Sequence, residues 1–146
     1  MSDLFKKILI ATDGSKYSLG AASKALEIAR FHGARVFALY VVDTRALVTA
    51  NGMPAPDNLY LILEDEGKRA VAQVKEMAGD LPAETFVLPG HPAQVIAQFA
   101  KDNGIDLIVT GTLGKSGIEE LLLGSVADKV IRTAPCPVLV VKSTKK

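Results

Sequence analysis

Five short apolar runs alternate with four longer segments of helical periodicity along this chain, and this alternation constrains the fold more than any other feature. The runs are rich in Val and Ile and show little polar alternation, which is typical of strands covered on both faces of a parallel sheet. They span residues 6–12, 35–43, 84–90, 106–111 and 137–142. The pattern predicts an α/β fold with an open parallel sheet and right-handed crossovers, because a barrel would need eight such units.

The intervening segments carry residues that start and stop helices. We expect helices within residues 15–33, 57–80, 91–104 and 125–134. Ser15 and Ser125 are candidate N-caps, Gly33 is a candidate stop, and Pro92 suits a first helical turn. The longest irregular connection, residues 44–58, contains two prolines and a glycine. Loops of that length are often functional, so this one is a flap over a site, a partner contact or a passive insertion.

Length and charge bound the possible functions. A chain of 146 residues fits one domain, residues 1–146. Its formal net charge is only +1, which argues against binding to nucleic acid or to an anionic membrane surface. No apolar run approaches the roughly 20 residues of a membrane span, and the N-terminal run is too short for a signal peptide. Cys136 is the single cysteine, so we expect a cytoplasmic protein without an intramolecular disulfide.

The tripeptide Gly114-Lys115-Ser116 raises the possibility of a P-loop, the phosphate-binding loop of many nucleotide hydrolases. A P-loop needs another glycine five positions before its Gly-Lys pair, so that successive backbone N–H groups surround the phosphates. Val109 occupies that position. The glycines of this region therefore serve a different kind of loop.

In an open parallel sheet, ligands bind beyond the carboxyl ends of the strands, where the chain order reverses. Asp13 directly follows the first run, and its carboxylate either caps a turn or helix or accepts from ribose hydroxyls. The fourth run ends at Gly111, and Gly124-Ser125 precedes the last helix. Glycine permits close approach of backbone N–H groups, and a helix N-terminus favours anions. These residues are either simple turns or a two-part cradle for phosphates.

The residues offer little for catalysis or for direct metal binding. No cluster of His, Cys and carboxylate has the spacing of a metal site, so any metal would arrive with the phosphates. Nothing near the glycines supplies a general base, so we assign no catalytic residue and expect any hydrolysis to be slow.

Two stretches, "ILIATDGSKYS" and "GTLGKSGIEELLLGSVADKVIRTAPCPVLVVK", make the chain resemble the universal stress protein family along its whole length. The nucleotide-binding branch of that family has the pattern Gly, two residues, Gly, nine residues, Gly, then Ser or Thr. Gly111, Gly114, Gly124 and Ser125 match this pattern.

The resemblance implies a Rossmann-like sheet in the order 3-2-1-4-5, with ATP at the switch between strands 1 and 4. Asp13 would contact the ribose, the main chain at Val41 would pair with adenine, and Mg²⁺ or Mn²⁺ would bridge the phosphates. Gly111 and Gly114 would lie near the ribose and the phosphates. Gly124, Ser125 and Val126, at the start of the last helix, would hold the phosphates. The expected ligand-contacting residues are Ala11, Thr12, Asp13, Val41, Thr110, Gly111, Gly114, Gly124, Ser125 and Val126.

The resemblance also implies a homodimer that pairs fifth strands through Pro137 to Val141. Three functions follow from these observations. The first is an ATP-binding regulatory protein of the stress response, whose nucleotide state is read by its own dimer or by an unknown protein partner. The second is a slow metal-dependent ATPase. The third is a dimeric scaffold that binds no nucleotide.

Overall fold

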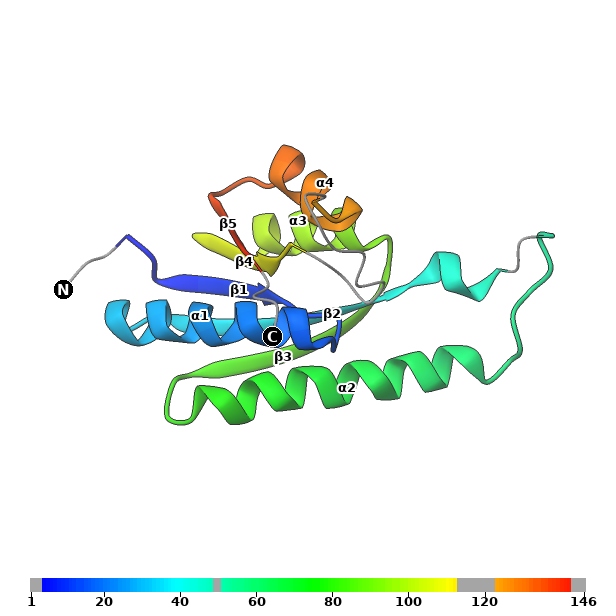
Figure 1. The fold of residues 1–146 in the computed structure, drawn as a ribbon, viewed down its shortest axis with the longest axis horizontal. Coiled ribbons are helices and arrows are strands. Elements are labelled where there is room, and N and C mark those ends of the chain that lie inside the picture. Colours follow the sequence, from blue (N-terminus) through cyan, green and yellow to red (C-terminus); the bar gives the residue numbers. More distant parts are fainter. Residues whose placement is uncertain (1–3, 49–50, 113–122, 143–146) are drawn as a thin grey trace.

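The computed structural model describes residues 4–48, 51–112 and 123–142, and in these residues five parallel strands form one sheet (Figure 1). Their order is β3-β2-β1-β4-β5, which confirms the predicted α/β class and strand order. The strands are β1 Lys7–Ala11, β2 Arg35–Asp43, β3 Ala83–Gly90, β4 Leu107–Gly111 and β5 Val138–Val141.

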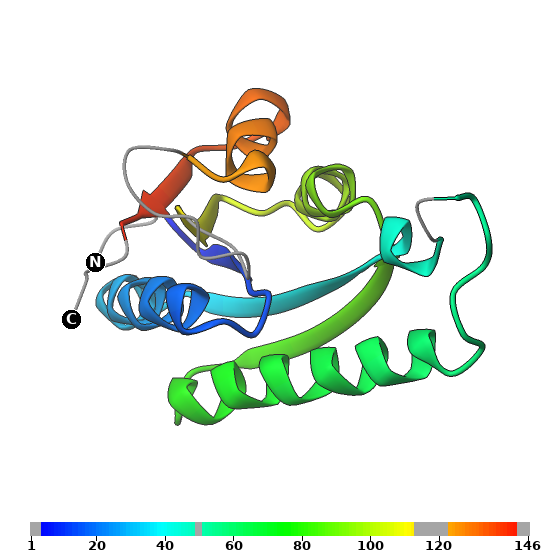
Figure 2. The same ribbon diagram turned by 45° about the vertical axis from the view of Figure 1, so that its right-hand side comes forward.

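Helices cover both faces of the sheet (Figure 2). α1 Lys16–His32 and α2 Leu59–Ala78 pack on one face, and α3 Pro92–Asp102 and α4 Ser125–Thr133 pack on the other. Ser15 caps α1 by accepting from the Ser18 N–H at 3.3 Å, and Gly33 ends the helix at φ 65°. Both were predicted from the sequence.

The central strand β1 explains where the chain order reverses. Ile8, Leu9 and Ile10 of β1 are fully buried. Ile8 pairs with Val36 of β2 on one side and with Leu107 of β4 on the other. The chain runs outward from β1 through β2 to β3, and it later returns to the other side of β1 through β4. The carboxyl ends of β1 and β4 therefore form the switch point at which ligands bind in open α/β sheets.

The connection between β2 and α2 is more ordered than the sequence suggests. It begins with η1, a 3₁₀ turn over Thr44–Leu47, and Val48 forms an isolated bridge with Pro54. In both ribbon views this segment extends away from the sheet beyond the end of β2 (Figures 1 and 2). Val48 and Met53 are more than half exposed there.

Candidate functional site

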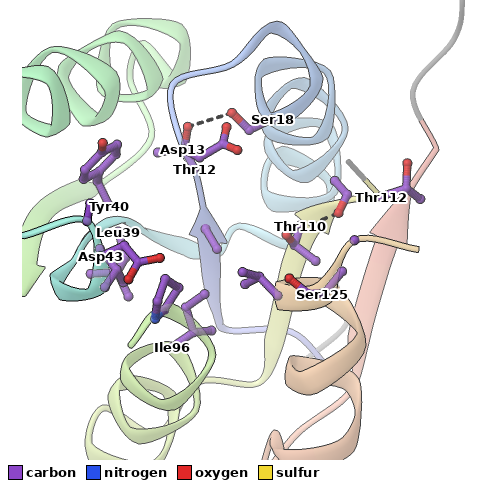
Figure 3. Close-up of a pocket in the computed structure, with 18 of the residues that line it drawn as sticks. Thr12, Asp13, Ser18, Leu39, Tyr40, Asp43, Ile96, Thr110, Thr112 and Ser125 are labelled. Carbon is purple, nitrogen blue, oxygen red and sulfur yellow. Dashed lines mark hydrogen bonds between the residues drawn. The ribbon is translucent and has the colours of Figure 1, made fainter. Parts of the chain in front are cut away.

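The turn after β1 is fixed by short-range hydrogen bonds. The Asp13 Oδ1 atom accepts from the Ser15 N–H at 2.9 Å. The Thr12 and Ser18 hydroxyls lie 2.9 Å apart and are buried, and Thr12 Oγ1 also accepts from the Gly14 N–H (Figure 3). These bonds hold Asp13 at the end of β1 with its second carboxylate oxygen available to a ligand.

The segment after β4 leads into the start of α4. The Gly124 N–H donates to the Thr112 carbonyl at 2.7 Å, so the end of β4 and the start of α4 lie close together. Gly124, not Ser125, is the N-cap of α4, and a glycine has no side chain with which to cap the helix. The expectation that Ser125 caps α4 is therefore wrong, because Ser125 is already its first helical residue. The N–H groups of the first turn consequently point outward without an internal acceptor.

The end of β2 supplies a second carboxylate. Asp43 accepts from the Arg45 backbone N–H and from both Nε and Nη2 of its guanidinium, at 3.0, 2.9 and 2.6 Å. The Arg45 side-chain hydrogen bond is the main reason that the pKa of Asp43 lies below its ordinary value, and partial burial opposes the shift. Asp43 is therefore an ionised anchor for η1, and its low basicity makes it a poor proton acceptor.

A cavity of about 380 Å³ lies between these three strand ends (Figure 3). The expected contact residues that line it are Ala11, Thr12, Asp13, Val41, Thr110, Gly111, Gly124, Ser125 and Val126. Gly114 lies outside the described residues. Expected contact residues from β1, β2, β4 and α4 thus line the same cavity. A volume of this size is typical of small-molecule sites.

Other lining residues were missed by the sequence analysis: Ser18, Leu39, Tyr40, Asp43, Ala46, Leu63, Pro92, Ile96, Thr112 and Ala127. Leu39 lies next to the end of β1, where the Thr12 N–H donates to its carbonyl at 3.0 Å, but β2 is buried without alternation from Val36 to Tyr40, so no sequence pattern distinguishes Leu39. Ile96 comes from α3, and no local signal places it here. Ala46 belongs to η1, so the start of the 44–58 connection forms part of the cavity wall.

The chemistry of the cavity divides into two parts. Aliphatic side chains such as Leu39 and Ile96 provide an apolar surface, and Asp13 provides an acceptor for hydroxyl groups. On another side the uncapped N-terminus of α4 presents backbone N–H groups and the positive end of a helix dipole. The arrangement suits a ligand with a flat apolar part, hydroxyl groups and a negative charge.

Residues 4–142 match the sequence model of the universal stress protein family. The chain belongs to the universal stress protein family. Universal stress protein MJ0531 of Methanocaldococcus jannaschii is 49% identical to it over 149 aligned positions, which cover 99% of this chain and 86% of that relative.

Solved structures agree with this assignment. Protein MJ0577 of Methanocaldococcus jannaschii superposes on this universal stress protein with a TM-score of 0.85 at 30% identity, over 98% of this chain and 99% of that chain. A universal stress protein solved in complex with cAMP superposes with a TM-score of 0.70 at 25% identity, over 97% of this chain and all of that chain.

Membrane-spanning helices and clusters of metal-ligating side chains are both absent from the described part of this universal stress protein. Residues 4–48, 51–112 and 123–142 contain no helix that is both long and apolar enough to cross a bilayer. The same residues contain no group of three or more His, Cys, Asp or Glu that could hold a metal ion.

Proposed function

We propose that this universal stress protein binds ATP, with the whole chain acting as one nucleotide-binding domain of the stress response. The observation that carries the proposal is the cavity at the β1/β4 switch point, where Asp13 and the uncapped start of α4 line one space. The similarity to a family member solved with cAMP supports an adenine nucleotide as the ligand class.

The proposed binding mode assigns one part of ATP to each part of the cavity. Adenine lies against the main chain at Val41, and Asp13 accepts from the ribose hydroxyls. The phosphates lie at Gly111 and at the segment from Gly124 to Val126, with Gly114 as a further contact. Thr12, Ala11 and Thr110 complete the wall. Because no metal cluster occurs in the described residues, Mg²⁺ or Mn²⁺ would be held chiefly by phosphate oxygens.

A regulatory role fits this cavity better than rapid hydrolysis. Asp13 accepts a backbone N–H, and Asp43 is ion-paired with Arg45. Both carboxylates therefore have structural partners, and neither is placed as a strong general base. We expect turnover well below about 1 s⁻¹, the low end of ordinary enzymes. A turnover well above that value would contradict the regulatory role. Slow ADP release that is lowered in an Asp13→Ala variant still able to bind ATP would favour the slow metal-dependent ATPase instead.

The substitution Gly124→Val tests the phosphate part of the proposal. Gly124 has φ −59° and ψ 151°, a conformation that valine adopts readily, so the variant should fold normally. We expect it to lose ATP binding in equilibrium dialysis, since the valine side chain fills the space that phosphate oxygens need. Adenosine, which has no phosphates, should bind the variant and the wild type alike. Equal ATP affinity in both proteins would remove α4 from the site.

The nucleotide state would be read by a protein partner or by a homodimer formed through β5. The Pro137 carbonyl accepts from Ile108 of β4, and the Val141 carbonyl accepts from Thr112, the residue after β4. The alternate residues Val138 and Val140 therefore direct their backbone groups to the open edge. Such an edge favours pairing with another strand. We expect Val140→Pro, which removes one edge donor and no donor to β4, to convert a dimer to a monomer in analytical ultracentrifugation. A monomeric wild-type protein would contradict the dimer. The cytoplasmic location stays a prediction.

A further inference from the structure

A second hollow lies on the outer surface between α3 and α4, the two helices that pack side by side on one face of the sheet (Figures 1 and 2). Its volume is about 870 Å³, larger than that of the nucleotide cavity. Pro92, Ser125 and Val126 line both spaces. The hollow, hereafter the α3/α4 groove, therefore adjoins the proposed phosphate end of the cavity.

The charge of the α3/α4 groove has one sign. Arg45, Lys101, Lys129 and His91 line it, and none of its lining residues is an aspartate or glutamate. Arg45 is paired with Asp43. Lys101 and Lys129 are exposed, and neither forms an ion pair with a carboxylate in the part of the chain that the structure describes. Two lysines are thus free to pair with an acidic ligand.

The acidic residues of the two helices do not cancel this charge. Asp128 of α4 pairs with Arg132 at 3.4 Å, and Asp102 of α3 accepts from the Gln98 side chain at 2.8 Å. Neither aspartate lines the groove. Among the described residues, the potential along the groove is therefore set chiefly by its two unpaired lysines.

The shape and lining of the groove suit a short extended peptide. From Pro92 to Lys101, α3 rises about 14 Å at 1.5 Å per residue, which matches about four residues of extended chain. Ala93 and Ala97 supply a small apolar floor, and Gln94 and Gln98 supply amide groups that can hydrogen-bond a peptide backbone. Small apolar and polar lining with a cationic rim is complementary to an acidic segment.

We propose that the α3/α4 groove binds an acidic segment of a partner protein and that bound ATP weakens this binding. Peptide binding is inferred from the residues that line the groove, whereas its weakening by ATP rests on the proposed nucleotide function. A triphosphate at Ser125 and Val126 would place negative charge at the end of the groove, where it repels carboxylates and reduces the attraction of the lysines. By linkage, the acidic segment weakens ATP binding by the same factor.

The test measures the fluorescence anisotropy of a labelled peptide of alternating Glu and Ala, with a Gln and Ala peptide as the neutral comparison. We expect the acidic peptide alone to bind, more weakly as the salt concentration rises. Lys101→Glu should weaken binding about tenfold, because it removes one attraction to the peptide and adds one repulsion. Lys129→Glu should act in the same direction.

The matched control is Lys75→Glu. Lys75 is an exposed lysine in the last turn of α2, as Lys101 is in the last turn of α3, but α2 covers the opposite face of the sheet. Lys75→Glu changes the net charge equally and should leave peptide affinity within about twofold of the wild type. An equal loss of peptide affinity in the Lys75 and Lys101 variants would mean that net charge alone causes the effect, and it would contradict binding in the groove.

Saturating ATP should weaken binding of the acidic peptide by about three- to tenfold, within the usual range of coupling between sites, and adenosine should not. If calorimetry detects no ATP binding while the peptide still depends on Lys101, the groove stands and the nucleotide function fails. If ATP binds and the peptide does not, the groove fails alone. An RNA oligonucleotide that binds more tightly than the peptide, with the same lysine dependence, would contradict a protein partner.

Discussion

Replacing glycine by alanine should change the free energy of unfolding in opposite directions at Gly67 of α2 and at Gly20 of α1. A Cβ built on Gly67 of α2 would lie 2.5 Å from Cδ1 of the Tyr40 ring and 2.9 Å from Cγ, whereas a Cβ on Gly20 of α1 meets no atom within 4 Å. Tyr40 is 3% exposed and lines the nucleotide cavity. Glycine at position 67 therefore makes room for a ring that forms part of the cavity wall.

The magnitudes follow from two opposing contributions. Replacing glycine by alanine inside a helix stabilises it by about 0.8–1 kcal/mol, and this gain should appear in full for Gly20→Ala. In Gly67→Ala the overlap with Tyr40 costs about 1–3 kcal/mol. The net effect on the free energy of unfolding should be a loss of about 1 kcal/mol, or roughly 3 °C in Tm for a chain of this size.

The assay is urea unfolding followed by circular dichroism, for both glycine variants in the wild-type and Tyr40→Leu backgrounds. Without the ring, Gly67→Ala should become stabilising, which gives a coupling of about 1–3 kcal/mol between positions 40 and 67. Gly67→Ala should also alter nucleotide affinity, whereas Gly20→Ala should not. A Gly67→Ala variant that is stabilised as much as Gly20→Ala would refute the packing of Tyr40 against α2.

Two further predictions concern the carboxylates at the ends of β1 and β2. Asp13→Asn keeps an oxygen acceptor for the Ser15 N–H but loses the charge, so the variant should fold normally. Calorimetry should show that it binds ATP about tenfold more weakly, since hydrogen bonds to charged groups contribute about 1.5–3 kcal/mol. The loss of affinity should be smaller for an ATP analogue without ribose hydroxyls, and an equal loss for both ligands would place Asp13 away from the ribose. Because Arg45 holds the pKa of folded Asp43 below that of the unfolded chain, ionised Asp43 stabilises the fold at neutral pH, and this contribution is lost as the pH falls below about 4 through the folded pKa. Urea unfolding at several pH values should therefore show Asp43→Asn less stable than the wild type at pH 7, with a difference that shrinks as the pH falls below about 4. A pH-independent difference would contradict the role of the charge.

The fold was predictable because its determinants are local and repeated. Buried apolar runs, helix starts such as Ser15 and helix stops such as Gly33 each act within a few residues. The strand order came from the family resemblance, not from periodicity, since apolar runs alone do not specify which strands are neighbours. The 3₁₀ turn of η1 was missed because it depends on the pairing of Asp43 with Arg45.

The candidate site was predictable where it lies at strand ends and unpredictable where it depends on packing. Asp13 and Gly111 follow apolar runs, so the general rule for open sheets points to them. Tyr40 reaches the cavity wall only because Gly67, far along the chain, leaves room for its ring. The capping role of Ser125 was mispredicted because Gly124 adopts the extended N-cap conformation itself. Such tertiary relations have no local sequence signal.

The most direct test of the nucleotide function is calorimetric titration of the nucleotide-stripped protein with ATP and Mg²⁺, with GTP and FMN as comparison ligands. The account predicts saturable binding of ATP at about one molecule per chain and weaker or no binding of GTP and FMN. No heat from ATP, in a protein that circular dichroism shows to be folded, would contradict nucleotide binding at the β1/β4 switch point and favour the dimeric scaffold.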